Sequence, residues 1–372
     1  MEHKSYDVAA YIWPAYTGDE IKANIFWPEE YGEWESVRSA QPKFEGHQWP
    51  RKPRWGYVNE ADPYVMEMQI NAATDHGVNT FIYDWYWFDN GPFLEQCLDN
   101  GFLKAHNNDK MKFYIMWANH DVNHVWDKRN AHKPWADLWS GKVTADQFKV
   151  IVDRWIDQYL LHPSYYRIDN KPVVQIYYLP NFIMGLGGIT EAQKSLDYMQ
   201  NRAIQAGLPG IHVQTQHLRG REYSESKIDR SFIRTDSEML DALKIDSTTH
   251  YQFATHCDVT RPFPEAVETA VKEWDYVRES TNIPFYPHVS IGWDNNPRFL
   301  TLQPNVMPEC TPQNFEVALR KAKEYVDKYC DVPLITINSW NEWTEGSYLQ
   351  PDDLNGYGYL EAVRNVFGPA NK

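Results

Sequence analysis

Short runs of β-branched and aromatic residues alternate with longer helical patterns along the whole 372-residue chain. Strands that alternate with helices form right-handed βαβ units, in which neighbouring strands are parallel. About eight such units, with no linker or change of composition between them, favour a closed (β/α)8 barrel over an open sheet. We therefore predict a single-domain barrel over residues 1–372. Its strands are expected at residues 8–12, 80–84, 112–117, 172–177, 211–215, 247–251, 285–291 and 333–338.

The helical stretches carry their own start and stop signals. Small polar residues cap the first turn of a helix, proline is favoured at its first position, and glycine often ends it. These signals predict one helix between Asp62 and Gly77. Further caps are expected at Thr144 and Thr190, in capping boxes with Gln147 and Gln193, and at Thr311 before Pro312.

The first strand is followed by a long connection. A nucleotide-binding open sheet, the alternative architecture, should show a glycine-rich turn here. The chain has Trp13-Pro14-Ala15-Tyr16 instead, which favours the barrel. Residues 13–60 are more than a turn requires, so we expect them to fold over the barrel mouth. They could form part of a site there, or only a rigid cover over the core.

The charge balance excludes several classes of partner. The net charge is −15, and no run is rich in lysine or arginine. An acidic surface repels phosphate backbones and anionic membranes, so nucleic acids and membrane surfaces are poor candidates. The apolar stretch at 173–188 is broken by Pro180 and does not reach the length of a membrane span. Residues 1–5 contain no apolar signal core, so we expect either a cytoplasmic protein or one whose signal peptide has been removed.

Cysteine and histidine spacing gives no metal motif. The four cysteines, Cys97, Cys257, Cys310 and Cys330, are widely spaced and form no C-x-x-C pair. His120, His124 and His132 resemble no compact metal-ligand pattern. We therefore expect no metal and no cofactor.

Aromatic, carboxylate and amide side chains gather where the expected strands end. In a barrel, residues just past the carboxyl end of a strand face the active site. Sugars present C–H faces that stack on rings, and hydroxyls that bind carboxylates and amides, so this composition indicates a sugar site. About half of the tryptophans are expected to be core instead. The candidate substrate-binding residues are Trp13, Asp84, Trp85, Trp117, Asn119, His120, Tyr177, Gln214, Tyr251, Trp293, Asp294, Trp340 and Asn341.

Glu342 and Glu345 are the candidate catalytic pair. Residues three apart in a turn can share one face, and two close carboxylates repel, so one holds a proton near neutral pH while the other stays ionised. Glycoside cleavage requires this division between acid and base. An isolated E-x-x-E is common on solvated helices, but here it lies between tryptophans at the end of the last strand. We expect Asp84, Trp117, Asp294 and Glu342 to open into one pocket.

Four stretches resemble a known family. They are 81–87 (FIYDWYW), 116–120 (MWANH), 292–295 (GWDN) and 339–346 (SWNEWTEG), and the resemblance continues to 355–360 (NGYGYL). They look like the WbsX-type proteins, which are relatives of the endo-α-mannosidases of glycoside hydrolase family 99. The resemblance implies a (β/α)8 barrel and metal-independent, retaining cleavage of α-mannosides. It further implies that Glu342 removes the proton of the sugar 2-hydroxyl, and that Glu345 protonates the leaving oxygen and later activates water.

Three functions follow as hypotheses. The first is a glycoside hydrolase acting on α-mannose- or α-rhamnose-type linkages, with an oligosaccharide or polysaccharide as its partner. The second is a glycosyltransferase of surface-polysaccharide assembly, although no Asp-x-Asp-like motif follows an expected strand. The third is a non-catalytic glycan-binding protein. Relatives of this kind in glycan-degrading bacteria are commonly exported, so we expect a periplasmic or cell-surface location.

Overall fold

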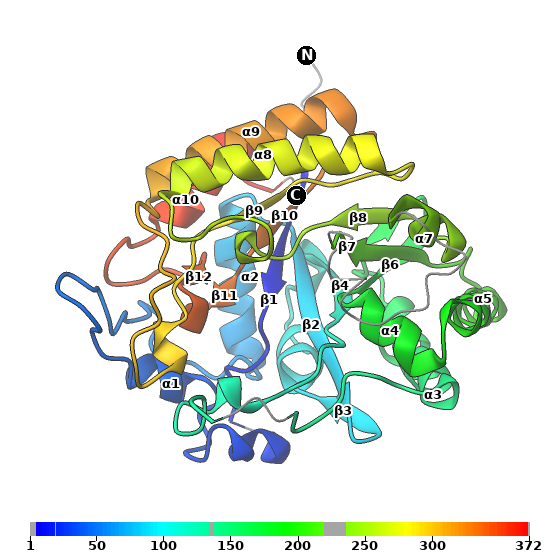
Figure 1. The fold of residues 1–372 in the computed structure, drawn as a ribbon, viewed down its shortest axis with the longest axis horizontal. Coiled ribbons are helices and arrows are strands. Elements are labelled where there is room, and N and C mark those ends of the chain that lie inside the picture. The colour runs from blue at the N-terminus through cyan, green and yellow to red at the C-terminus, as the bar shows by residue number, and fades with distance from the viewer. Residues whose placement is uncertain (1–4, 19, 134–136, 219–235, 371–372) are drawn as a thin grey trace.

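Eight parallel strands form the centre of the molecule, in the order β8-β7-β6-β4-β2-β1-β10-β9 (Figure 1). The structure is a computed structural model that describes residues 5–18, 20–133, 137–218 and 236–370. Residues 1–4 belong to the segment considered above for a signal peptide, and they lie outside the described residues. The strands are β1 Asp7–Ile12, β2 Thr80–Phe88, β4 Lys112–Trp117, β6 Lys171–Ile176, β7 His212–Gln216, β8 Ser247–Thr249, β9 His288–Ser290 and β10 Leu334–Asn338.

The two ends of this strand order meet at Thr248 of β8. Its backbone N–H donates to Pro284 O at 2.9 Å, and its carbonyl accepts from Tyr286 N at 2.9 Å. Residue Phe285, just before β9, forms the bridge with Thr248. The sheet is thus nearly closed, and the predicted (β/α)8 barrel is confirmed.

All eight strands lie where the sequence predicts them, with shifted ends. The largest shift is in β2, which continues through Phe88 and pairs there with the short strand β3 Gly91–Phe93. A second short strand, β5 Arg167–Ile168, pairs antiparallel with β6.

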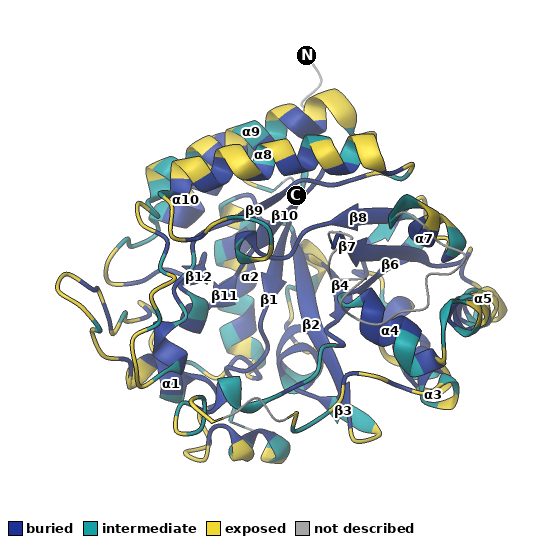
Figure 2. Ribbon diagram, in the orientation of Figure 1, coloured by how far each residue is buried: buried dark blue, intermediate teal, exposed yellow. Residues whose placement is uncertain are grey.

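Helices surround the strands. Each strand is followed by at least one of α2 Pro63–Asp75, η2 Cys97–Phe102, α3 Ala145–Trp155 with η5 Ile156–Leu160, α4 Leu179–Leu186 with α5 Ile189–Gln205, α7 Asp236–Ala242, α8 Phe263–Ser280, α9 Pro312–Tyr329 and α10 Gly358–Phe367. Figure 2 shows buried strands, with exposed residues on the outer faces of α8, α9 and α5. None of the helices in the described ranges is long and apolar enough to cross a membrane.

The helix caps agree with the sequence in three of four places. Asp62 caps α2, Thr144 caps α3 in a full capping box, and Thr311 caps α9. The prediction at Thr190 is wrong, because α5 begins at Ile189 and Thr190 lies inside its first turn. Gly187 and Gly188 have φ angles of 94° and 116°, and this left-handed backbone ends α4 and starts α5.

The first connection contains η1 Ile21–Ile25 and α1 Trp34–Arg38. It lies on the side where β1 ends (Figure 1) and is tied to the last loops of the barrel. His47 and Trp49 both contact Asp294, and Trp34 packs against Trp343 with ring centroids 5.7 Å apart. The connection therefore folds over the barrel mouth, as expected.

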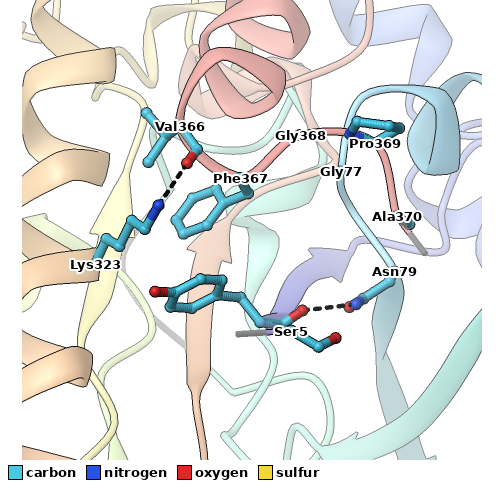
Figure 3. A pocket seen from close by; sticks show the side chains of 10 residues that line it. Ser5, Gly77, Asn79, Lys323, Val366, Phe367, Gly368, Pro369 and Ala370 are labelled. Atoms are coloured by element: carbon cyan, nitrogen blue, oxygen red, sulfur yellow. Dashed lines mark hydrogen bonds between the residues drawn. The ribbon is translucent and has the colours of Figure 1, made fainter. Parts of the chain in front are cut away.

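A hollow of about 400 Å³ lies at the opposite end of the barrel (Figure 3). Its lining includes Tyr6, which precedes β1, and Asn79, which precedes β2. Lys323 donates to the carbonyl of Val366 across it at 3.0 Å. This is the amino-terminal face of the strands, and in TIM-barrel enzymes the active site lies at the other face.

Candidate functional site

The glutamate pair lies in a tight hairpin after β10. Strands β11 Asn341–Glu342 and β12 Ser347–Tyr348 pair antiparallel, and the 3-10 turn η8 Trp343–Glu345 joins them. Glu342 directly precedes this turn and Glu345 ends it, and both side chains project into the same cavity. Gly346 closes the hairpin with a φ of 63°, and a Cβ there would lie 3.1 Å from that of Asp294.

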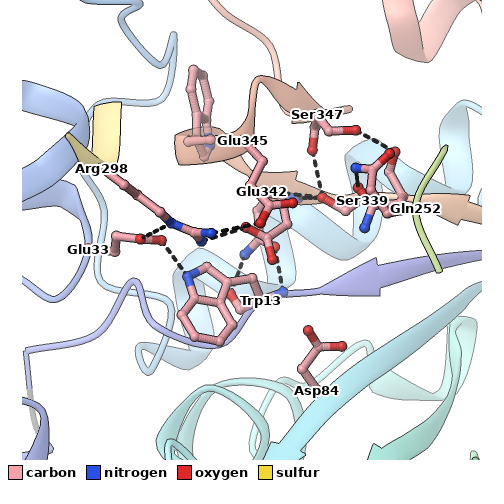
Figure 4. A network of polar contacts seen from close by, with 12 residues as sticks. Trp13, Glu33, Asp84, Gln252, Arg298, Ser339, Glu342, Glu345 and Ser347 are labelled. Carbon is pink, nitrogen blue, oxygen red and sulfur yellow. Dashed lines mark hydrogen bonds and ion pairs between the residues drawn. The ribbon is translucent and has the colours of Figure 1, made fainter. Parts of the chain in front are cut away.

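One guanidinium group binds both glutamates (Figure 4). Arg298, at the end of η7 Asn296–Arg298, donates through Nη1 to Glu345 at 2.7 Å and through Nη2 to Glu342 at 3.2 Å. Its Nε donates to Glu33 at 3.0 Å. Glu33 also accepts from the indole N–H of Trp13 at 2.5 Å. A residue of the long first connection therefore anchors the arginine that holds the candidate catalytic pair.

This cluster holds three carboxyl groups and one buried guanidinium group. Glu33, Glu342 and Arg298 are 0, 3 and 6 % exposed. Burial would lower the pKa of Arg298, but Glu33, Glu345 and Glu342 raise it well above the usual range. Burial, followed by the charge of Glu345, raises the pKa of Glu342 well above its usual range. Burial also raises the pKa of Glu345, although Arg298 opposes the shift. At neutral pH the cluster is therefore expected to hold at least one proton.

Asp84 adds a further carboxyl group on the facing side of the cavity (Figure 4). The hydroxyl of Tyr251 lies 2.9 Å from Asp84 Oδ2 and 3.2 Å from Glu342 Oε1, so it connects the two carboxyl groups. Asp84 is 2 % exposed, and its Oδ1 has no hydrogen-bond partner among the described residues. Burial raises the pKa of Asp84 well above its usual range.

These groups line a cavity of about 340 Å³ at the carboxyl ends of the strands. Aromatic rings form much of its wall: Trp13 packs against Trp126 at 4.9 Å and edge-on against Tyr86 at 5.7 Å. His120 lies edge-on to both Tyr86 and Tyr177. Apolar walls with a few convergent polar groups are typical of small-molecule sites. The lining residues are Trp13, Asp84, Tyr86, Met116, Ala118, His120, Val125, Trp126, Tyr177, Tyr251, Trp293, Asn295, Arg298, Glu342 and Glu345.

Eight of the residues proposed from the sequence thus meet in one cavity. They are Trp13, Asp84, His120, Tyr177, Tyr251, Trp293, Glu342 and Glu345. They come from loops spread over the whole chain, and the barrel brings them together because all its strands end at one face.

Seven other proposed residues do not line this cavity. Trp85 and Trp117 face outward from the barrel wall: Trp85 donates to Glu95 at 2.7 Å, and Trp117 stacks on Phe148. Side chains alternate across a strand, so Asp84 and Tyr86 of β2 face the cavity while Trp85 does not. Trp340 also lies in the core, where it donates to Gln69 and packs against Phe81.

The remaining four proposed residues make structural contacts. Asn119 exchanges two hydrogen bonds with the backbone of Tyr178. Gln214 lies inside the barrel, where its side chain forms hydrogen bonds with Tyr114 and Ser247. The side chain of Asn341 forms hydrogen bonds with the backbone N–H and the carbonyl of Trp13.

Asp294 is the last of these four, and it supports the glutamate turn. Its backbone N–H donates to Glu345 O at 2.7 Å. Its carboxylate accepts from Trp49, and it binds His47 at 2.8 Å. Hydrogen bonds from His47, Asn296 and Trp49 hold the pKa of Asp294 below its usual value despite burial. The expectation that Trp117 and Asp294 open into the same pocket as Asp84 and Glu342 is therefore wrong.

The structure adds residues to the site that the sequence did not suggest. Arg298 and its anchor Glu33 were missed, as were the wall residues Tyr86 and Trp126. Tyr86 could have been found from strand alternation with Asp84. Trp126 lies on η4 His124–Trp126 in the loop after β4. In the described part of the chain, no three His, Cys, Asp or Glu residues are arranged to hold a metal ion.

The fold resembles solved glycoside hydrolases. One is a protein named "Glycoside hydrolase-like protein", with a TM-score of 0.64, 14% identity and coverage of 99% of this chain and 95% of that one. Another is the family 99 endo-α-mannosidase of Bacteroides thetaiotaomicron, with a TM-score of 0.57, 15% identity and coverage of 97% and 96%. At these identities the likeness concerns the fold.

Sequence relatives are found in Xanthomonas campestris pv. campestris. The protein named "Uncharacterized protein WxcX" is 26% identical over 357 residues in two strains. The match covers 92% of this chain and 47% of the relative, so the chain spans about half the length of these relatives. The family model described as "Glycosyltransferase WbsX" matches residues 8–363. The chain therefore belongs to the WbsX family, as its sequence motifs suggested, and its fold resembles that of the family 99 endo-α-mannosidase.

Proposed function

We propose that the protein is a glycoside hydrolase that cleaves α-mannose- or α-rhamnose-type linkages with retention of configuration. The observation that carries this proposal is the convergence of Glu342 and Glu345 on one aromatic-walled cavity, where Arg298 binds both. Rings of this kind suit the C–H faces of a sugar, while Asp84, His120 and Asn295 offer partners for its hydroxyls.

In the proposed reaction the sugar supplies its own nucleophile. Glu342 takes the proton of the 2-hydroxyl, oxygen 2 forms a bond to the anomeric carbon, and the bond to the leaving oxygen breaks. Glu345 gives its proton to that oxygen. It then removes a proton from water, which opens the strained sugar intermediate while Glu342 returns its proton to oxygen 2.

The hairpin geometry supports this division of work. Two carboxyl groups on one side of a single turn are badly placed to straddle a sugar ring, as an inverting pair would have to do. They are well placed to serve two neighbouring oxygens of one sugar. In α-mannosides and α-rhamnosides oxygen 2 lies trans to the leaving oxygen, so the attack is intramolecular and gains from favourable orientation.

The family description favours a glycosyltransferase as the second candidate. The charge of the cavity argues against a nucleotide-diphosphate donor. Its cationic side chain, Arg298, already directs three nitrogens to carboxylates. A diphosphate would have to compete with Glu33, Glu342 and Glu345 for that one guanidinium, and carboxylates repel it.

The decisive experiment is a screen of defined α-mannans and rhamnans with product analysis, in which nucleotide sugars are tested as donors. Glu345→Gln is run beside it, with Glu279→Gln as the matched control, because Glu279 lies on the outer helix α8 and its side chain is 68% exposed. We expect cleavage by the parent and by the control, and a large loss in Glu345→Gln. Transfer from a nucleotide sugar without hydrolysis would favour the second candidate.

A further inference from the structure

The hydroxyl group of Tyr251 joins two buried carboxyl groups. It lies 2.9 Å from Asp84 Oδ2 and 3.2 Å from Glu342 Oε1. A tyrosine has one proton to donate, and an ionised carboxylate can only accept. The tyrosine can align its one O–H with only one of the two carboxyl oxygens, so two well-aligned hydrogen bonds require a proton on one carboxyl group, which then donates to the tyrosine oxygen. In that arrangement the three groups hold one proton more than the tyrosine's own.

The surroundings decide which carboxyl group holds that proton. Glu342 receives a hydrogen bond from Arg298 at 3.2 Å, which stabilises its ionised form and opposes the rise in pKa that burial and Glu345 cause. Asp84 has no such cation among the residues described, and its Oδ1 has no hydrogen-bond partner there. Burying an ionised carboxylate without partners costs far more free energy than burying the neutral acid. The contacts thus favour a proton on Asp84.

The position of Tyr251 is fixed by its neighbours. Its ring packs edge-on against Tyr11 at 4.8 Å and against Tyr177 at 5.1 Å. The titratable and charged groups around Asp84, Tyr251 and Glu342 are Tyr11, Tyr16, Glu33, Tyr86, His120, Tyr177, Arg298 and Glu345. Burial lowers the pKa of His120, so Arg298 is the permanent cation among them. It lies beside Glu342 and therefore favours the ionised form of Glu342 over that of Asp84.

We propose that Asp84 is a neutral carboxylic acid that donates through Tyr251 and thereby keeps Glu342 ionised, ready to act as a base. This inference rests on the proposed function for the role of Glu342, but the hydrogen-bond pattern does not. In the proposed hydrogen-bond pattern, Asp84 Oδ2–H donates to the tyrosine oxygen, and the tyrosine O–H donates to Glu342 Oε1. Asp84 acts on Glu342 through Tyr251, so toward the base it is a positioning residue, whatever contact it also makes with a sugar hydroxyl.

The first test reads protonation without activity. Infrared difference spectra of the parent against Asp84→Asn, near neutral pH, should show the loss of a protonated carboxyl C=O band. The matched control is Asp146→Asn, because the side chain of Asp146 is 91% exposed and should lose carboxylate bands instead. Loss of carboxylate bands in Asp84→Asn would overturn the inference, even if the parent cleaves none of the glycosides tested.

The second test uses the pH profile of kcat/KM on a substrate that the parent cleaves. In Tyr251→Phe, Glu342 loses a donor, so the acid limb should move to higher pH. In Asp84→Asn the amide can donate to Tyr251 as the neutral acid does, so the limb should stay in place although the lost cavity contact lowers the rate. A limb that moves to lower pH in Asp84→Asn would mean that Asp84 is ionised in the parent, which contradicts the inference. If Tyr251 and Asp84 had a purely structural role, kcat/KM would fall in both variants and the acid limb would move in neither, Tyr251→Phe included.

Discussion

Replacing Arg298 with methionine should make the stability of the protein strongly dependent on pH. The variant keeps most of the side-chain volume but leaves Glu33, Glu342 and Glu345 buried without their shared cation. Removing one partner of a buried ion pair costs about 3–5 kcal/mol, because the remaining charge is uncompensated. Unfolding entropy of about 2.1 cal/mol/K per residue gives roughly 0.8 kcal/mol/K for 372 residues. The expected fall in Tm is therefore about 4–6 °C near neutral pH.

The sign of the pH dependence follows from the direction of the pKa shifts. Burial already raises the pKa values of Glu342 and Glu345, and Arg298 opposes this rise. Without Arg298 the folded-state pKa values rise further above the unfolded ones. Groups of this kind contribute stability below the unfolded pKa and lose it as pH rises through the folded pKa. The Tm deficit of Arg298→Met should therefore be small in acid, below the ordinary glutamate range, and should grow as pH rises towards and past neutrality.

Differential scanning calorimetry across this pH range measures the effect. The control is Arg320→Met, which removes the exposed α9 pair with Glu316, a kind of pair usually worth about 0–1 kcal/mol. Arg298→Lys should keep part of the stability at neutral pH, since it retains a charge, but a lysine cannot offer the fixed fork that binds three carboxylates. A deficit in Arg298→Met that is the same at all pH values, or no larger than that of Arg320→Met, would refute this account of the cluster.

Three further predictions concern the proposed reaction. Glu345→Gln should lose about 10²–10⁴-fold in turnover, most on substrates with poor leaving groups, whereas Glu342→Gln should slow all substrates alike; near-parent turnover in either variant would contradict the assignment. Activity should survive exhaustive chelation, since two carboxyl groups and a sugar hydroxyl need no Lewis acid; loss on chelation with rescue by a divalent ion would require another mechanism. NMR should detect the retained anomer first, and a 2-deoxy substrate should resist cleavage; an inverted product, or undiminished cleavage of the 2-deoxy substrate, would end the proposal of 2-hydroxyl participation.

The barrel could be predicted from the sequence because it depends on local patterns. Strand and helix periodicity, with caps at Asp62, Thr144 and Thr311, are properties of a few neighbouring residues. The prediction at Thr190 failed because Gly187 and Gly188 allow a left-handed backbone that starts the helix earlier. Which of several nearby signals sets a helix boundary depends on how the preceding helix ends, and the cap residues alone do not reveal this.

The tryptophans show how one strand boundary affects a site prediction. With β2 ending at Asp84, Trp85 would be a mouth residue, free to face the cavity. The strand continues through Phe88, so alternation sends Trp85 outward to Glu95 and Tyr86 inward to the cavity. Trp117 ends β4 and is likewise directed outward, between Met116 and Ala118, which both line the cavity. Periodicity carried past the expected strand ends would have distinguished these residues.

Arg298 and Glu33 could not be found in this way. Their contact joins residues 265 positions apart, and no local pattern distinguishes a buried arginine in a loop from an exposed one. The sequence therefore predicted a mouth of rings, carboxylates and amides, and the structure adds the cation on which the charge state of that mouth depends.

The long first connection is both a cover for the core and a part of the site. Glu33 is fully buried, and it accepts from Trp13, which forms the cavity wall, and from Arg298, which holds the glutamates. A single carboxylate thus fixes an aromatic surface and a charge relative to each other. Because Arg298 is shared among Glu33, Glu342 and Glu345, any movement of the connection changes how much of its charge the two catalytic candidates receive. The position of Glu33 in this connection therefore contributes to the protonation of a pair more than 300 positions away in the sequence.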